Sequence, residues 1–289
     1  MRYLSAAVDT YTRGSGWGEV HSMLMELLIE RLWPGNRWRN YHYLLACPRT
    51  GEALAIDPLD WELCLQRCRE RGWTLRGIFN THEHHDHVGG NEPLRAATGA
   101  QVLALATAVG KIPHVDQRLQ AGDVIRIGET HCLRVLDTPG HTFAHACLLS
   151  EETQPRLFCG DTLFSAGAGN CHNGGDPRAL YDSFSQQLFT LDDRTLIYPG
   201  HDYMVRNLAF TLDREPGNQR AARQLKAVEH LDGLSTPVTT LGEERELNTF
   251  FRLQNDEIID RLRQVLPDLP AHPDPRTIFL ALRHLRNDW

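Results

Sequence analysis

The sequence has no excess of positive charge. It carries 30 lysine and arginine residues against 37 aspartate and glutamate residues, a formal net charge of −7. Nucleic-acid binding depends on cationic side chains that neutralise phosphates, and no basic tract is present to supply them. The composition therefore argues against a nucleic-acid partner.

Long apolar runs are also missing. No stretch reaches the roughly 20 residues that a membrane-spanning helix needs, and residues 1–5 lack the apolar segment of a secretory signal. Internal repeats and low-complexity tracts are absent as well. With 41% hydrophobic residues among 289, the chain can form a sizeable core as one large domain or two ordinary ones. We expect no membrane partner.

Paired cysteines are not evident. The seven cysteines are odd in number and scattered, and most lie in apolar runs: Cys47, Cys64, Cys68, Cys132, Cys147, Cys159 and Cys171. Cys64 and Cys68 share a helical face, but no second pair completes a zinc knuckle. Free core thiols are typical of a reducing compartment, so we expect a cytoplasmic protein.

Histidine, in contrast, is concentrated in THEHHDHVGG, residues 81–90. Neutral imidazole and carboxylate together suit a zinc-like or iron-like divalent ion. In an extended loop His82 and His84 point to the same side, whereas the neighbours Asp86 and His87 diverge from that pair. The stretch predicts two adjacent metal positions, one for each pair. An exposed polar loop with incidental histidines is the alternative.

The surrounding pattern alternates strands and helices. We expect a helix over residues 60–71 that Gly72 ends, and another over residues 87–98 with Asp86 at its cap. Strands are expected over residues 41–46, 53–57, 75–80, 101–106, 132–136, 156–159 and 195–198.

Three more candidate ligands follow predicted strands. His141 comes after a Pro-Gly turn, in a good position for a third ligand at the first metal, and His201 repeats this arrangement. Asp161 follows a strand and a glycine, where a carboxylate can bridge two ions; capping a turn is its alternative role. His145 begins another apolar run and is expected to be structural. Ligands at several strand ends predict an α/β layered domain with its site along one sheet edge.

Strand signals end near residue 203. Residues 204–213, 218–231, 256–266 and 276–286 show helical patterns. We therefore predict a metal-binding catalytic domain over residues 1–203 and a smaller helical substrate-binding domain over residues 204–289. The glycine-rich segment 11–18 is expected to be irregular.

The ordered ligand set resembles that of the metallo-β-lactamase superfamily over roughly residues 40–203. The resemblance implies a four-layer αβ/βα sandwich with two divalent ions at its edge, zinc first, with iron or manganese as alternatives. Asp86 and Asp161 are the implied catalytic carboxylates. The implied ligands are His82, His84, His141 and Asp161 for one ion, and Asp86, His87, His201 and Asp161 for the other.

Within that superfamily the chain is most similar to glyoxalase II, the hydroxyacylglutathione hydrolases. The similarity rests on four segments: NLAF (207–210), EPGN (215–218), TLGEE (240–244) and NTFFR (248–252). It implies hydrolysis of a small-molecule thioester, such as S-lactoylglutathione, by a hydroxide that bridges the metals. The helical C-terminal region would form part of the substrate site.

The loop after Asp161 departs from the glyoxalase II pattern. Asn170 stands where a basic residue is expected, and His172 stands where a tyrosine is expected. Tyr203 and Arg252 are retained. The resemblance therefore gives these four residues as substrate-binding candidates, with Arg252 as the main remaining anion anchor.

Other functions stay open. A persulfide dioxygenase of the same superfamily would hold a single iron by His82, His141 and Asp161, and residues 198–203 are similar to that branch. A hydrolase of a thioester without glutathione is a further alternative. The intact ligand set argues against a non-catalytic binding module, and the acidic balance argues against a nuclease.

Overall fold

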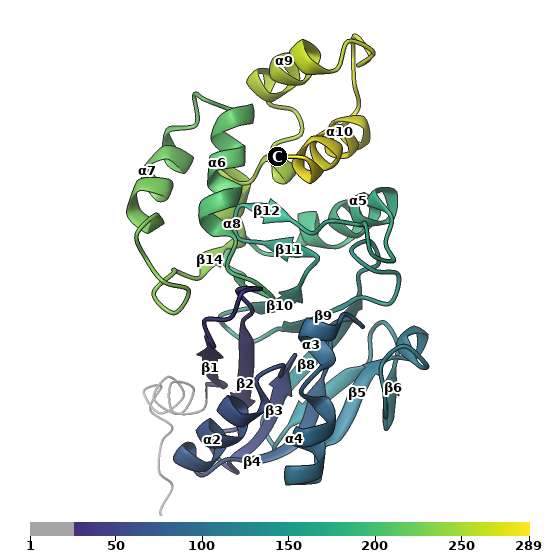
Figure 1. Cartoon of the computed structure of the whole chain (residues 1–289), viewed down its shortest axis with the longest axis vertical. Coiled ribbons are helices and arrows are strands. Elements are labelled where there is room, and N and C mark those ends of the chain that lie inside the picture. Colours follow the sequence, from purple (N-terminus) through teal and green to yellow (C-terminus); the bar gives the residue numbers. More distant parts are fainter. Residues whose placement is uncertain (1–25) are drawn as a thin grey trace, which may run out of the picture.

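The computed structural model describes residues 26–289; segment 11–18 lies outside them. Its main feature is a pair of six-stranded sheets (Figure 1). The first has the order β1 (Leu28–Leu32), β2 (His42–Ala46), β3 (Glu52–Ile56), β4 (Thr74–Phe79), β5 (Gln101–Leu105), β6 (Gln117–Leu119). The second has the order β14 (Thr239–Thr240), β13 (Leu196–Pro199), β10 (Arg156–Gly160), β9 (Ala146–Ser150), β8 (His131–Asp137), β7 (Val124–Ile127). A two-stranded ribbon consists of β11 (Leu163–Phe164) and β12 (Gly167–Ala168).

Helices cover the outer faces of both sheets. The first sheet carries α2 (Trp61–Arg71), α3 (His85–Val88) and α4 (Asn91–Thr98). The other helices lie toward the second sheet or follow it: α5 (Pro177–Gln186), α6 (Met204–Arg214), α7 (Gln219–Val228), α8 (Leu241–Leu247), α9 (Asp256–Val265) and α10 (Pro275–Asn287). Short 3₁₀ turns are η1 (Ala106–Ala108), η2 (Leu188–Thr190) and η3 (Thr249–Phe251). No helix within residues 26–289 is long and apolar enough to cross a membrane.

Side-chain alternation along the strands produces the layers. In β2, Tyr43 and Leu45 pack between the two sheets, whereas Leu44 and Ala46 pack against α2 and α4. Both sets are buried because each face of the strand is covered by another layer. The predicted four-layer α/β sandwich is confirmed.

The helix predicted over residues 60–71 is α2, and its ends are as expected. The Asp60 side chain accepts a hydrogen bond from the Leu63 amide at 3.0 Å, and Gly72 adopts a left-handed φ of 67° at the C-terminal end. All seven cysteines are free, and five of them are buried, which confirms the prediction of core thiols.

The single helix predicted over residues 87–98 is wrong, because it is divided into α3 and α4 by Gly89 and Gly90. A Cβ atom on Gly90 would lie 1.8 Å from the Pro58 carbonyl oxygen, so the chain passes too close to that backbone for a side chain. Asp86 is therefore inside α3 rather than at a helix cap, and His84 occupies the cap position.

The expectation of no strand after residue 203 is also wrong. Thr239 and Thr240 form β14, which pairs with Ile197 and Leu196 of β13. A two-residue strand is too short to give a periodic signal. The C-terminal helices also share a core with the second sheet, as Phe279 of α10 packs in the cluster that contains Leu149 and Leu157. The division at residue 203 stays a prediction.

A buried carboxylate joins α8 to the ribbon formed by β11 and β12. One oxygen of Glu244 accepts hydrogen bonds from the Ala166 amide (2.8 Å) and Asn248 Nδ2 (2.9 Å), and the other accepts from Thr239 Oγ1 (2.7 Å). Burial raises the pKa of Glu244 to about 7, because desolvation of the charged form outweighs these donors.

This pKa predicts a pH-dependent contribution to stability. Between the ordinary value of 4.5 and about 7, the folded chain holds the Glu244 proton more tightly than the unfolded chain does. The free energy of unfolding should therefore fall as pH rises through this window, by on the order of 3 kcal/mol. Glu244→Gln should abolish that part of the fall in urea denaturation at pH 5 and pH 8. The exposed Glu229→Gln should keep the wild-type difference, and an unchanged slope in Glu244→Gln would contradict the assignment.

Candidate metal centre

The seven predicted ligands lie at one edge of the sandwich, each after the end of a strand. His82 and His84 follow β4, and α3 carries Asp86 and His87. His141, Asp161 and His201 follow β8, β10 and β13. Their donor atoms form three overlapping groups, each within 4.8 Å: His82, His84 and His141; His82, His87 and Asp161; Asp86, His87 and His201.

In the first part of the cluster, three imidazole nitrogens converge. His84 Nδ1 is 3.0 Å from both His82 Nε2 and His141 Nε2. The opposite nitrogens of His84 and His141 face the carbonyl oxygens of Asn173 (2.9 Å) and Asn170 (2.6 Å). A carbonyl oxygen only accepts hydrogen bonds, so these outer nitrogens carry the protons.

The tautomer of His82 follows from a chain of hydrogen bonds. Thr81 Oγ1 donates to Asp57 Oδ2 at 2.7 Å, so it accepts from His82 Nδ1 at 3.0 Å. His82 Nε2 is then unprotonated. Burial lowers the pKa of His82 well below its ordinary value, which keeps the ring neutral.

The second part of the cluster has the same arrangement, with ring nitrogens close together inside and hydrogen-bonded ring nitrogens outside. His87 Nε2 and His201 Nε2 are 3.2 Å apart, and Asp86 Oδ2 lies 3.6 Å and 3.4 Å from them. Their outer nitrogens donate to Asp57 Oδ2 (3.0 Å) and the Trp38 carbonyl oxygen (2.8 Å).

Asp161 lies between the two parts. Its Oδ2 is 3.4 Å from His141 Nε2 and 3.2 Å from His201 Nε2, and its Oδ1 is 3.5 Å from His87 Nε2. Burial would raise the pKa of Asp161, but the facing imidazoles of His201 and His87 hold it well below its ordinary value. Its Oδ1 is buried and finds no hydrogen-bond donor in the part of the chain that the structure describes.

These observations test whether divalent ions fit the cluster. In their neutral forms all five imidazoles turn an unprotonated nitrogen inward, at contacts of 3.0–3.2 Å. Burial would lower the pKa of His87, but the carboxylates of Asp161 and Asp57 raise it to about 10, so this position attracts a cation. An orphaned buried carboxylate oxygen faces the same space. Outer hydrogen bonds that fix the tautomer are typical of metal-binding histidines. The donor set could therefore hold divalent metal ions.

Three supporting residues lie outside the predicted ligand set. His145 Nε2 accepts a hydrogen bond from the Asp161 amide at 3.1 Å, which agrees with a structural role. Asp57 connects Thr81 and His87, and Asn40 contacts Asp86. Asp57 follows a strand, as Asp161 does, so the sequence could have indicated that it belongs to the site. Nothing in the sequence around Asn40 indicated that Asn40 does.

Three of the four substrate-binding candidates lie beside the cluster. Tyr203, Asn170 and His172 line one cavity of about 210 Å³. The Tyr203 ring stacks on the His201 ring at 4.9 Å, which places the cavity directly next to the predicted ligands. Three arginines that the sequence did not single out line it too: Arg206, Arg283 and Arg286.

Arg252, the fourth candidate, does not line this cavity. Its guanidinium group pairs with Glu215, at 2.7 Å from Nε to Oε2 and 2.5 Å from Nη2 to Oε1. The Glu215 side chain is only 4% exposed, so the ion pair is largely buried. Arg252 lines a separate cavity with Tyr181 and Phe251. Its positive charge is used to hold the C-terminal helices together.

None of the three cavity arginines pairs with an Asp or Glu side chain in residues 26–289, although Arg206 Nη2 donates to the Trp289 oxygen. Arg283 Nη1 donates to the carbonyl oxygens of Ala168 (2.8 Å) and Gly169 (2.9 Å), and Arg286 Nη2 donates to Asn207 Oδ1 (3.1 Å). Burial lowers the pKa of Arg283 and of Arg286 to about 10, so both remain charged at neutral pH. The cavity is therefore suited to an anion.

Comparison with known proteins agrees with this geometry. Residues 47–201 match the family model of the metallo-beta-lactamase superfamily, and residues 202–289 match that of the hydroxyacylglutathione hydrolase C-terminus. The chain belongs to the hydroxyacylglutathione hydrolase family. The predicted family is thereby confirmed.

Individual relatives extend over most of the chain. Hydroxyacylglutathione hydrolases from Nitrosococcus oceani and Polaromonas sp. are each 56% identical over 263 residues, which is 91% of this chain and 100% of each relative. The crystal structure of ETHE1 from Myxococcus xanthus has 29% identity and a TM-score of 0.62, and covers 90% of this chain and 98% of that one. TTHA1623 in a di-iron-bound form has 26% identity and a TM-score of 0.54, with coverages of 77% and 99%.

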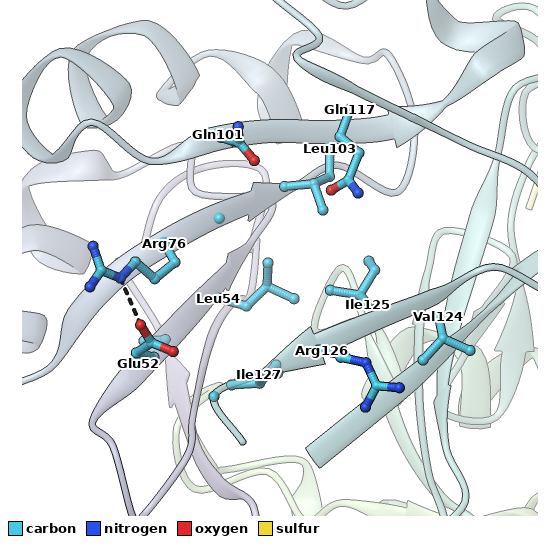
Figure 2. Close-up of a pocket in the computed structure, with 13 residues that line it drawn as sticks. Glu52, Leu54, Arg76, Gln101, Leu103, Gln117, Val124, Ile125, Arg126 and Ile127 are labelled. Atoms are coloured by element: carbon cyan, nitrogen blue, oxygen red, sulfur yellow. Dashed lines mark hydrogen bonds and ion pairs between the residues drawn. The ribbon is translucent and has the colours of Figure 1, made fainter. Parts of the chain in front are cut away.

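A different cavity of this hydrolase-family chain lies at the opposite ends of the strands. It has a volume of about 330 Å³, and Figure 2 shows Leu54, Leu103 and Ile125 within it. Its charged pair is satisfied, because Arg76 Nε donates to Glu52 Oε1 at 3.0 Å. It contains no convergent metal-binding group in the described residues, so the metal cluster is the candidate site.

The bridging position of Asp161 gives a direct prediction. Asp161→Ala should abolish activity and lower metal content at both positions, because its two oxygens face both parts of the cluster. Elemental analysis of the purified variant measures this, with the exposed Asp268→Ala as the control. Normal metal content in Asp161→Ala would show that the bridging assignment is wrong.

Proposed function

We propose that this chain hydrolyses the thioester of a hydroxyacylglutathione, of which S-lactoylglutathione is the type, with two divalent metal ions. The observation that carries the proposal is the position of the cluster. Seven converging candidate ligands lie directly beside a cavity lined by three arginines that pair with no Asp or Glu side chain in the described residues. The curated relatives named hydroxyacylglutathione hydrolase support the same substrate class.

The proposed ligands fall into two sets, one for each metal ion. His82, His84 and His141 would hold one ion, and Asp86, His87 and His201 the other, with Asp161 shared. Imidazole and carboxylate donors suit zinc, and iron or manganese are alternatives. When bound, such ions lower the pKa of water and polarise a carbonyl group.

The protein's own contribution to catalysis is to hold two carboxylates at fixed positions in the cluster. Asp161 and Asp86 are proposed as the catalytic carboxylates, because they bring negative charge into a cluster of imidazoles and fix where the ions would lie. The nearby thiols are unsuited to act as nucleophiles, because burial raises the pKa of Cys147 to about 12 and that of Cys159 well above its ordinary value. A covalent acyl-enzyme is therefore not part of the proposal.

The arginine cavity would hold the glutathione portion, which carries two carboxylates. Arg286 and Arg206 are the accessible cations, and Tyr203 adds a phenol between them and the cluster. Asn170 and His172 form the other wall, where the family pattern has a cation and a phenol. The proposed substrate site thus depends on α6 and α10.

The proposed domain division at residue 203 is supported by the two family models, which meet between residues 201 and 202. A cytoplasmic location is proposed from the seven free cysteines. Membership of the hydrolase family favours hydrolysis over the dioxygenase alternative.

The reaction type can be tested directly. We expect the purified protein to hydrolyse S-lactoylglutathione, followed by the loss of thioester absorbance, without consuming oxygen. Removal of the metal ions with a chelator should abolish the reaction, and added zinc should restore it. Oxygen uptake with glutathione persulfide, together with a single bound iron, would instead establish the dioxygenase alternative.

The two arginine positions predict different kinetic effects. Arg286→Ala should raise KM for S-lactoylglutathione roughly tenfold, with a smaller effect on kcat, because a charge-assisted contact far from the reacting carbonyl is lost. Arg252→Ala should instead lower the free energy of unfolding by about 3 kcal/mol, because Glu215 loses its partner. Steady-state kinetics and urea denaturation on both variants separate the roles. If Arg252→Ala has normal stability but a high KM, Arg252 rather than Arg286 binds the anionic group of the substrate.

A further inference from the structure

The segment between β1 and β2 lies along the chain that carries His201. Tyr41 N donates to the Gly200 carbonyl oxygen at 2.8 Å, and Asp202 N donates to the Arg39 carbonyl oxygen at 2.9 Å. An isolated β-bridge joins Asn40 to His201. We call residues 36–41 the clamp segment, because its backbone is paired to the His201 loop on both sides of that bridge.

Two residues of the clamp segment, Asn40 and Trp38, contact proposed ligands of one metal position only. Asn40 Nδ2 donates to Oδ2 and to the carbonyl oxygen of Asp86, both at 3.2 Å. The Trp38 carbonyl oxygen accepts from His201 Nδ1 at 2.8 Å. Asn40 is 1% exposed, and its own Oδ1 accepts from Asn36 Nδ2 at 3.1 Å, which fixes its amide orientation.

The other metal position is supported from different parts of the chain. His141 and His84 donate to carbonyl oxygens of Asn170 and Asn173, in the loop after β12. His82 is held by Thr81, beside it in sequence. None of these contacts involves the clamp segment. Asp57 supports both positions, because its Oδ2 accepts from Thr81 and from His87, whereas the contacts of the clamp segment reach only Asp86 and His201.

We infer that the clamp segment is a positioning element for the metal position of Asp86, His87 and His201, and that Asn40 is its key positioning residue. The Asn40 amide holds the Asp86 carboxylate in the orientation that faces His201 Nε2, at 3.4 Å. The Trp38 carbonyl keeps the His201 proton on Nδ1, so the lone pair of Nε2 is available to a metal ion. The inference rests on the proposed two-metal function.

Arg39 fixes the clamp segment without contacting a proposed ligand. Its Nε donates to the Asp202 carbonyl oxygen at 2.8 Å, and its Nη2 pairs with the Asp202 carboxylate. Its backbone has a φ of 60°, which asparagine tolerates better than most residues. Arg39→Asn therefore removes the ion pair with little backbone strain, and the Arg39 side chain is 46% exposed, so the variant should fold.

The test is metal binding to the full-length protein after chelation. Calorimetric titration of the wild type with zinc should show two binding steps. In Asn40→Ala one of the two steps, assigned to the position of Asp86, His87 and His201, should weaken by about 10–100-fold while the other keeps its affinity. Arg39→Asn should weaken the same step to a lesser degree. Arg37→Ala, an exposed neighbour that stacks on Trp38, is the matched control and should behave as wild type.

Manganese loading gives an independent spectroscopic readout. Electron paramagnetic resonance of the wild type should show a spin-coupled pair, and Asn40→Ala at limiting manganese should show isolated ions. Two unchanged steps in Asn40→Ala, or equal weakening of both, would overturn the inference. If Asn40→Ala does not fold, two unaltered steps in folded Arg39→Asn would overturn it. A wild type that binds only one ion would instead overturn the two-metal function.

Discussion

The constraint on which the rest of the structure depends is the burial of converging electron pairs. Five inward imidazole nitrogens and the oxygens of Asp161 face one small space, at contacts as short as 3.0 Å. Without cations, such an arrangement costs free energy, because lone pairs in close contact repel and a buried carboxylate oxygen is left without a donor. The fold must therefore supply enough rigid support to hold the ligands together until metal ions compensate them.

That support comes from outside the ligand motif. Asp57 at the end of β3 connects Thr81 and His87, and His145 holds the Asp161 backbone. Each of these hydrogen bonds either keeps a proton on the outer nitrogen of a ring or holds a carboxylate residue in place. Strand ends are suited to this task because the sheet hydrogen bonds fix where the next residues begin. Loops carry the chemistry, and two packed sheets determine its geometry.

The cluster and the arginine cavity are connected through one side chain. Arg283 of α10 donates to the carbonyl oxygens of Ala168 and Gly169. The next residue, Asn170, supplies the carbonyl oxygen that accepts from His141. The docking of α10 therefore fixes the cation-lined cavity and also the loop that orients a proposed metal ligand. Phe279 packs this helix against Phe184 of α5 and Phe250 of η3.

Local chemistry in the sequence determined much of this protein. The dense histidine stretch and the two Pro-Gly-His turns predicted the ligands, because their spacing places them directly after strands. The alternation of predicted strands and helices, with candidate ligands at the strand ends, predicted an α/β layered domain. The break between α3 and α4 was missed, because it depends on the distant Pro58 backbone. β14 was missed because two residues carry no period.

Only the tertiary structure decided which charges face the site. The sequence does not reveal any difference between Arg252 and Arg286, because both are arginines in the helical C-terminal region. One is neutralised by Glu215, 37 positions away, and the other opens into the cavity beside Tyr203. Likewise, Asn40 reaches Asp86 across 46 positions. Sequence patterns report neighbours within a few residues, whereas the pairing of charges depends on how helices pack, and packing brings together residues that no local period connects.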